Sequence, residues 1–217
     1  MAKCGVNPQT YYNPDLYTCK PSINPNGIFL INPVSYGGES YEAVLIGTQT
    51  WMARNLNFNA TGSVCYENEP ENCDKYGRLY DWDMAMDNAS SSNATPSGVQ
   101  GVRPDGWHLP SDAEWSVLMT AVGGYFTAGT KLKAASGWSS GNGTDDYGFS
   151  ALPGGSRSTD GSFSVGTGGG GYWWTATERE SGSNAFFQCM GSGYEYVIDG
   201  SGNKAFGFSV RCLQDVR

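Results

Sequence analysis

The sequence has little of what metal centres and hydrolase active sites usually need. It contains a single histidine, His108, and its six cysteines form no CxxC pair. A zinc site would therefore have to be built from scattered cysteines. Ser-His-Asp catalysis would depend on His108 alone, without a nucleophile-elbow motif. We interpret this histidine, in the run Trp107-His108-Leu109-Pro110, as a packing residue rather than a general base.

Positive charge and long apolar stretches are also scarce. The 13 Lys and Arg are scattered singly among 21 Asp and Glu, for a net charge of −8. No basic stripe exists to neutralise phosphates, so we expect no nucleic-acid partner. No stretch approaches the roughly 18 apolar residues of a membrane span, and Met1-Ala2-Lys3 opens no apolar signal core. We expect no membrane span in this chain, and we interpret it as beginning after a removed signal or anchor.

Glycine, tyrosine and cysteine, by contrast, are plentiful. With 31 Gly, 13 Tyr and 39% hydrophobic residues, the composition is typical of a loop-rich, strand-containing secreted protein. Several disulfide connectivities are open, and we favour three local ones, each closing a short loop that contains turn residues. Because such bonds persist where thiols stay oxidised, we predict a secreted or cell-surface protein. The favoured pairs are Cys4–Cys19, Cys65–Cys73 and Cys189–Cys212.

Prolines divide the chain into two parts. Four of the ten prolines lie within residues 3–27, which show almost no periodicity, and this predicts a small disulfide-closed segment and a linker over residues 1–33. This segment either caps the fold or presents Tyr11, Tyr12 and Tyr17 as a minor binding module. Residues 34–217 then form the main domain, with enough chain for one sizeable core.

Helix and strand signals are clearest in the main domain. Ser111 and Glu114 have the spacing of a capping box, and the apolar residues that follow predict a helix over residues 111–122. The segment GRLYDWDMAMD predicts a second helix, whereas SVCYENEPENCDKYG is interpreted as a solvated acidic loop. Strands are predicted on both sides of Gly47-Thr48 and in a closing meander of YWWTATE, NAFFQCM, YEYVI and AFGFSVRC.

An ordered set of motifs resembles a known bacterial family. YEAVLIGTQTWMARNLNF, CYENEPENCDKYGRLYDW, GWHLPSDAEWSVL, AGTKLKA, GTDDYGFSALPGG, YWWTATE and GFSVRC, between Tyr41 and Asp215, look like the Fibrobacter succinogenes major paralogous domain. GWHLPSDAEW is also similar, more remotely, to the helix-opening motif of formylglycine-generating-enzyme-like domains. Both resemblances imply an α+β, C-type-lectin-like fold, in which two helices flank a twisted antiparallel sheet with long loops. The family implies secretion or surface display, but fold alone does not fix function.

Calcium is the cofactor to consider in such a fold, although the Glu-Pro-Asn, Gln-Pro-Asp and Trp-Asn-Asp motifs of calcium-dependent sugar-binding lectins are missing. Asn142, Asp145 and Asp146 form the best cluster of oxygen ligands for a hard cation. The same residues are ordinary turn and cap residues, so the alternative is a loop without metal.

An aromatic surface is the other candidate site. Adjacent strand residues point to opposite faces, so Trp173 and Trp174 cannot both enter the same face of a sheet. The outward ring would stack a sugar, with other side chains bonding its hydroxyls; alternatively, the second Trp is covered by the loop over residues 166–171. The predicted ligand-binding residues are Tyr172, Trp173, Trp174, Glu178, Arg179, Asn184, Tyr194 and Tyr196.

These observations together favour a non-catalytic recognition module whose partner is a polysaccharide or a cell-surface protein. A structural or adhesive surface domain without a small ligand is one alternative. The other is an oxidase of the formylglycine-generating type, which would need Cys189 and Cys212 as reactive thiols that bind copper. A structural disulfide between these two cysteines would explain both without such chemistry.

Overall fold

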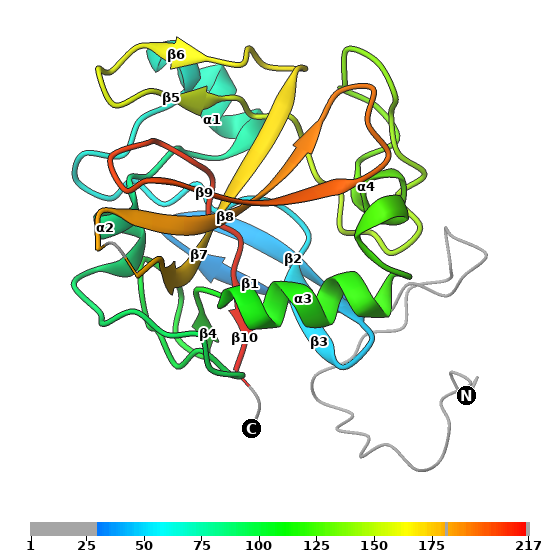
Figure 1. The fold of residues 1–217 in the computed structure, drawn as a ribbon, viewed down its shortest axis with the longest axis horizontal. Coiled ribbons are helices and arrows are strands. Elements are labelled where there is room, and N and C mark those ends of the chain that lie inside the picture. The colour runs from blue at the N-terminus through cyan, green and yellow to red at the C-terminus, as the bar shows by residue number, and fades with distance from the viewer. Residues whose placement is uncertain (1–29, 181, 216–217) are drawn as a thin grey trace.

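The computed structural model describes residues 30–180 and 182–215. In this part of the chain, antiparallel sheets and short helices are connected by long loops (Figure 1). This mixture of helix and sheet agrees with the predicted α+β class. The predicted Cys4–Cys19 disulfide and most of the segment 1–33 lie outside the described residues.

One layer is a five-stranded sheet with the order β1-β2-β3-β10-β4. Its β2–β3 hairpin follows the prediction, since the two strands are antiparallel and are joined at Gly47-Thr48. Strand β1, which begins at Leu30 within the predicted linker, was not predicted. Gly47 has a φ of 62°, which a residue without a Cβ adopts without strain. The strands are β1 (Leu30–Tyr36), β2 (Glu39–Ile46), β3 (Gln49–Met52), β4 (Trp107–His108) and β10 (Leu213–Gln214).

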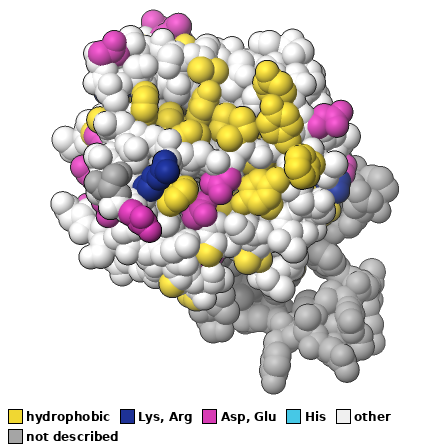
Figure 2. Space-filling view, in the orientation of Figure 1, with side chains coloured by type: hydrophobic (Ala, Val, Ile, Leu, Met, Phe, Trp, Pro, Cys, Tyr) yellow, Lys and Arg dark blue, Asp and Glu magenta, His cyan; other side chains and the backbone are white. Residues whose placement is uncertain are grey.

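A three-stranded sheet, β7-β8-β9, corresponds to most of the predicted closing meander. Its register places Trp173, Gln188 and Asp199 side by side on one face. Figure 2 shows hydrophobic side chains gathered over this part of the surface, with acidic side chains between the sheet and helix α3. The strands are β7 (Gly170–Glu178), β8 (Asn184–Gly191) and β9 (Val197–Asn203), and a separate pair is β5 (Ser156–Arg157) with β6 (Phe163–Ser164).

The C-terminal segment connects the two sheets. Phe208 pairs with Tyr80 and Ser209 pairs with Trp173, so this segment lies beside β7 on the side opposite β8. It then continues into β10, which pairs with both β3 and β4. The meander strand predicted over AFGFSVRC is thus replaced by isolated pairings that precede β10.

The helices only partly match the prediction. Helix α3 forms where predicted, whereas α2 is shorter than its predicted segment because Leu79 and Tyr80 pair with Val64 and Phe208 instead of joining the helix. The helix then stops at Asp87, which adopts a left-handed conformation with φ 46°. The acidic segment between Cys65 and Cys73 is solvent-exposed, as predicted, but it is not a loop throughout, since a helix begins at Pro70, a favoured first helical residue. No helix in the described residues is long and apolar enough to span a bilayer. The helices are α1 (Pro70–Tyr76), α2 (Trp82–Met86), α3 (Asp112–Ala121), α4 (Tyr125–Leu132) and the 3₁₀ turn Tyr66–Asn68.

The start of α3 contains the predicted capping box and a buried histidine. Ser111 Oγ accepts a hydrogen bond from Glu114 N at 3.1 Å, and Glu114 Oε2 accepts one from Ser111 N at 2.9 Å. The other carboxylate oxygen of Glu114 lies 2.8 Å from His108 Nε2, and Asp215 Oδ1 lies 2.7 Å from Nδ1. His108 is therefore a buried, fully hydrogen-bonded residue, as its interpretation as a packing residue requires.

The cysteines confirm one predicted disulfide and overturn another. Cys65 and Cys73 are bonded, across the 3₁₀ turn and α1. The Cys189–Cys212 pairing was wrong, because both cysteines are free and buried. The prediction assumed that their strands were neighbours, but β7 lies between β8 and the C-terminal segment.

The charge of His108 predicts a pH-dependent stability. Burial alone would lower its pKa, but hydrogen bonds and charges from Glu114 and Asp215 outweigh burial and raise the pKa above 6.5. A histidine whose pKa rises on folding stabilises the protein most below pH 6.5, and this contribution is lost as the pH rises through the folded-state pKa. Urea unfolding should therefore show that His108→Gln destabilises more at about pH 6 than at about pH 8.5. A pH-independent difference would contradict this.

The free cysteines predict a specific alkylation pattern. Cys189 is 7% exposed and Cys212 is fully buried, so neither should react with iodoacetamide in the native protein. After unfolding in urea without reductant, peptide mapping should find both residues alkylated and Cys65 still linked to Cys73. A peptide containing Cys189 bonded to Cys212 would contradict the structure.

Candidate functional site

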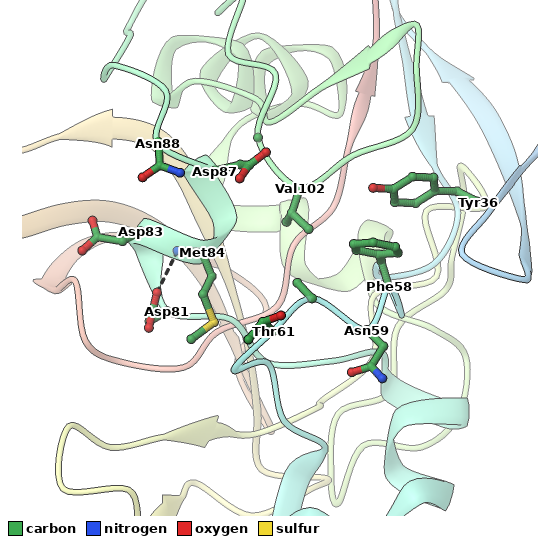
Figure 3. Close-up of a pocket in the computed structure, with 12 residues that line it drawn as sticks. Tyr36, Phe58, Asn59, Thr61, Asp81, Asp83, Met84, Asp87, Asn88 and Val102 are labelled. Atoms are coloured by element: carbon green, nitrogen blue, oxygen red, sulfur yellow. Dashed lines mark hydrogen bonds between the residues drawn. The ribbon is translucent and has the colours of Figure 1, made fainter.

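A pocket of about 560 Å³ opens between the end of β1, the loop over residues 58–61, and α2 (Figure 3). The three segments are distant in sequence and meet because β1 and β2 form a hairpin whose turn lies against Phe58. At Gly37, in that turn, an added Cβ would come 2.7 Å from the Phe58 ring. Glycine at this position therefore lets the hairpin approach the 58–61 loop closely enough to form one wall of the pocket.

That wall consists of two aromatic rings. The rings of Tyr36 and Phe58 have their centroids 4.5 Å apart and are tilted by 30°. Both side chains are half-buried, so each keeps part of its surface towards the pocket. Burial, followed by the nearby Cys212 and Asp87, raises the pKa of Tyr36, so its hydroxyl stays protonated and can donate a hydrogen bond.

The opposite wall is polar and acidic. Asp81 caps the start of α2, where its side chain accepts a hydrogen bond from Met84 N at 2.8 Å. Asp83, the second residue of the helix, is exposed. Asp87 and Asn88 follow the helix in left-handed conformations, which turns the chain along the rim. Figure 3 shows these side chains on the side of the pocket away from Tyr36 and Phe58. The described residues that line the pocket include no Lys or Arg.

This arrangement suits a ring-shaped polar molecule. Aromatic faces bind the apolar C–H face of such a ring, while carboxylates and amides such as Asn59 bond its hydroxyls. The volume lies within the roughly 300–1,000 Å³ of small-molecule sites. The pocket can therefore both stack and orient a ligand.

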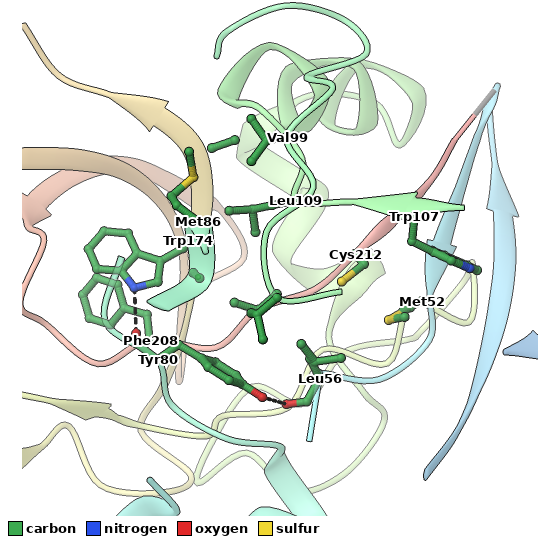
Figure 4. Close-up of a cluster of buried hydrophobic side chains, with 14 of the residues drawn as sticks. Met52, Leu56, Tyr80, Met86, Val99, Trp107, Leu109, Trp174, Phe208 and Cys212 are labelled. Carbon is green, nitrogen blue, oxygen red and sulfur yellow. Dashed lines mark hydrogen bonds between the residues drawn. The ribbon is translucent and has the colours of Figure 1, made fainter. Parts of the chain in front are cut away.

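The predicted aromatic surface is not available in the structure. Trp173 and Trp174 do enter opposite faces of β7, but each is fully buried. Trp173 Nε1 donates to Asn55 Oδ1 at 2.8 Å, and Trp174 Nε1 donates to the carbonyl of Tyr80 at 2.9 Å (Figure 4). The prediction that one indole stacks a ligand was wrong, because the core covers one face of β7 and Tyr80 with the C-terminal segment covers the other.

The other predicted ligand-binding residues lie at two separate places. Glu178 forms an ion pair with Lys204, and Arg179 Nη1 donates to Ser201 Oγ; with Asn184 they lie where β7 turns into β8. Tyr194 and Tyr196 contact each other at the far end of β8, where they are 54% and 38% exposed. Strand β8 separates the two groups by roughly 20 Å, at about 3.3 Å per residue. Tyr172 is half-buried and stacks on Phe208.

The candidate cation ligands are engaged in shaping their own loop. Asn142 Oδ1 accepts from Trp138 N at 3.0 Å, and both carboxylate oxygens of Asp145 accept hydrogen bonds from Ser150. Asp146 is half-buried beside them. Within residues 30–180 and 182–215, no group of three or more His, Cys, Asp or Glu is arranged to hold a metal ion.

The two free cysteines lack the character of reactive thiols. Burial raises the pKa of Cys189 to about 11, and burial raises that of Cys212 to about 12. Both groups are therefore protonated at neutral pH, whereas thiolates are the form that attacks or binds metals. Figure 4 shows Cys212 among the apolar side chains of the core.

Sequence reasoning missed the pocket. Its acidic wall lies in the segment DWDMAMDN, most of which the sequence analysis assigns only to a predicted helix. Nothing in the sequence links that segment to Tyr36 or Phe58, which come from other parts of the chain. The one local sign of an acidic pocket wall is Asp87, a third carboxylate that lies beyond the start of the predicted helix.

The family comparison agrees with the resemblance read from the motifs. A model of the Fibrobacter succinogenes major domain matches residues 44–214, most of the chain. The chain belongs to this family. No curated protein and no solved structure matches it. The matched range of the Fibrobacter major domain includes the 58–61 loop and α2 of the pocket, whereas Tyr36 lies before it.

Proposed function

We propose that this Fibrobacter major domain is a non-catalytic, C-type-lectin-like recognition module that binds polysaccharide in the pocket of Figure 3. The observation that carries the proposal is the pair of contacting rings, Tyr36 and Phe58, facing a carboxylate and amide wall. Polysaccharides present both surfaces that such a pocket needs: flat C–H faces and rows of hydroxyls. The pocket is open to solvent, so a polysaccharide chain can extend beyond the sugar unit that the pocket holds.

The proposed location is outside the cell or on its surface. The Cys65–Cys73 disulfide supports this, because such bonds persist where thiols are not kept reduced. Binding without catalysis is supported by His108, whose two ring nitrogens both contact carboxylates away from the pocket. A cell-surface protein displaying a similar ring and hydroxyl pattern would be the alternative ligand.

Substitutions in the pocket should weaken retention on an insoluble polysaccharide such as cellulose or hemicellulose. Tyr36→Ala removes one ring, and Asp83→Asn removes an exposed carboxylate without changing its size. We expect Tyr36→Ala to weaken binding about tenfold, the equivalent of roughly 1.4 kcal/mol. Pull-down isotherms measure the change, and thermal unfolding identifies any variant that has lost its fold.

Two matched controls locate the effect. Tyr194→Ala removes an exposed ring at the far end of β8, and Asp74→Asn removes an exposed carboxylate from α1. Both should bind like the wild type. Equal retention of all variants, or a loss confined to Tyr194→Ala, would refute the pocket. Failure to bind any glycan on an array would favour an adhesive domain without a small ligand.

The acidic lining also predicts which polysaccharides bind. Because Asp81, Asp83 and Asp87 line the pocket with no Lys or Arg among its described lining residues, a negatively charged ligand would be repelled. Neutral glycans should therefore bind more tightly than otherwise similar glycans that carry uronate or sulfate groups, and more so at low salt. A preference for the anionic glycans on the array would contradict this prediction.

A further inference from the structure

The pocket of Figure 3 combines two kinds of wall that both attract positive charge. One wall holds the aromatic rings of Tyr36 and Phe58, and the other holds carboxylates from α2 and its two ends. The face of an aromatic ring carries partial negative charge, because its π electrons are concentrated above and below the ring plane. Hydroxyls alone do not require such a combination, whereas an organic cation benefits from both walls.

Asp87 is the carboxylate best placed to contact a cation in the pocket. It directly follows the last residue of α2, and its side chain is exposed. Within the described part of the chain, this side chain forms no ion pair. Figure 3 shows it directed across the pocket, towards the side that holds Tyr36, with Val102 between the two. An unpaired carboxylate and an aromatic pair therefore lie on opposite sides of one space.

The positive side chain next to the pocket in the chain is already engaged. Arg103 follows the pocket residue Val102, but its Nε donates to the carbonyl of Gln100 at 3.0 Å and its Nη1 to that of Pro104 at 3.0 Å. The same Nη1 lies 3.6 Å from Asp105 Oδ1. A ligand that brings its own positive charge into the pocket therefore gains attraction without breaking an ion pair between described residues.

The other lining groups indicate that this positive charge belongs to a sugar. Asn59, Thr61 and Asn88 are exposed, and each can bond a hydroxyl. A lysine side chain is a narrow apolar stem without hydroxyls, so it would leave these groups and much of the pocket of about 560 Å³ unused. A sugar ring with an amino substituent uses every wall, since it offers hydroxyls, an apolar C–H face and an ammonium group.

We infer that the pocket selects polysaccharides whose sugar units carry a protonated amino group, with Asp87 accepting a hydrogen bond from the ammonium and the rings of Tyr36 and Phe58 binding the cationic sugar ring. A charge-assisted hydrogen bond and a cation–π contact are both stronger than their neutral counterparts. The inference rests on the proposed function, because it names the sugar that the same pocket would hold. It extends the expected order of affinity, which becomes cationic, then neutral, then anionic glycans.

The preference for an amino sugar should follow the protonation of the ligand. We expect the amino group to lose its proton near pH 8, roughly as α-amino groups do. In the protein, burial, followed by Cys212 and Asp87, raises the pKa of Tyr36 above 10, and burial raises the pKa of Cys212 to about 12, so both stay neutral up to about pH 9. The groups that carry charge in or beside the pocket are Asp81, Asp83, Asp87, Arg103 and Asp105.

Calorimetric titration with oligosaccharides of equal length from chitosan, chitin and cellulose tests the inference. These three differ in one substituent of each sugar, which is an amine, an acetylated amine or a hydroxyl. At about pH 6 and about 0.15 M salt, we expect the chitosan oligosaccharide to bind about tenfold more tightly than the cellulose one. At about pH 9 this ratio should fall to near one, because the amine is then neutral. The two neutral oligosaccharides measure any effect of pH on the protein itself.

Asp87→Asn tests the ammonium contact directly. Asparagine adopts the left-handed conformation of this position readily, and its amide can still bond hydroxyls, so α2 should keep its end and only the charge is lost. We expect the ratio of the chitosan affinity to the cellulose affinity at about pH 6 to fall about tenfold, to near one. Asp74→Asn, on α1, removes the same charge from outside the pocket and should keep the wild-type ratio. It controls for the general attraction of an acidic protein to a cationic ligand.

The outcomes separate this inference from the proposed function. If the cellulose oligosaccharide binds and Tyr36→Ala weakens it, but the amine adds no affinity at about pH 6, the pocket binds polysaccharide and the inference is wrong. A preference that survives in Asp87→Asn, or that is lost equally in Asp74→Asn, would also overturn it. Tighter binding of a lysine oligomer than of a chitosan oligosaccharide of equal charge would assign the pocket to a protein partner. If no oligosaccharide binds, both proposals fail.

Discussion

The carboxylate of Glu114 is the group on which the arrangement of this protein depends. Its Oε2 accepts hydrogen bonds from the backbone nitrogens of Ser97 and Ser111, and its Oε1 contacts His108. The backbone oxygen of the same residue accepts from Gln49 on β3. One buried residue thus connects the start of α3, two strands of the five-stranded sheet and the long loop before β4. A buried carboxylate is costly unless fully hydrogen-bonded, and here every bond also fixes a chain segment.

The pocket and the contact between Asp112 and Gln188 both rely on this connection. The loop bound through Ser97 continues to Val102, whose backbone nitrogen donates to Ala85 of α2, so the rim of the pocket is attached to the same network. In the other direction, the capping of α3 at Ser111 fixes the position of the next residue, Asp112, against Gln188. The rim of the pocket and Asp112 are thus both attached to the first turn of α3.

The sequence revealed what is encoded locally. Ser111 and Glu114 are three residues apart, so their capping box and α3 could be predicted from spacing alone. The Cys65–Cys73 disulfide closes a short loop and was equally accessible. The free state of Cys189 and the pairing of Tyr36 with Phe58 could not be predicted, because each depends on which distant segments become neighbours. Hydrophobic alternation shows which side chains share one face of a strand, but it does not show which distant segment packs against that face.

The two adjacent tryptophans show why recognition is proposed at the margins of the fold. Alternation correctly placed Trp173 and Trp174 on opposite faces of β7, and a sheet with one open face would then expose one of them. Here Phe208 packs against Trp174 at 4.5 Å between ring centroids, while Trp115 lies 6.4 Å from Trp173, so β7 is covered on both faces. A central strand buried on both sides stabilises the fold but presents no side chain to a ligand. Contacts with partners must then come from loops, short helices and edge strands, which is where the pocket lies.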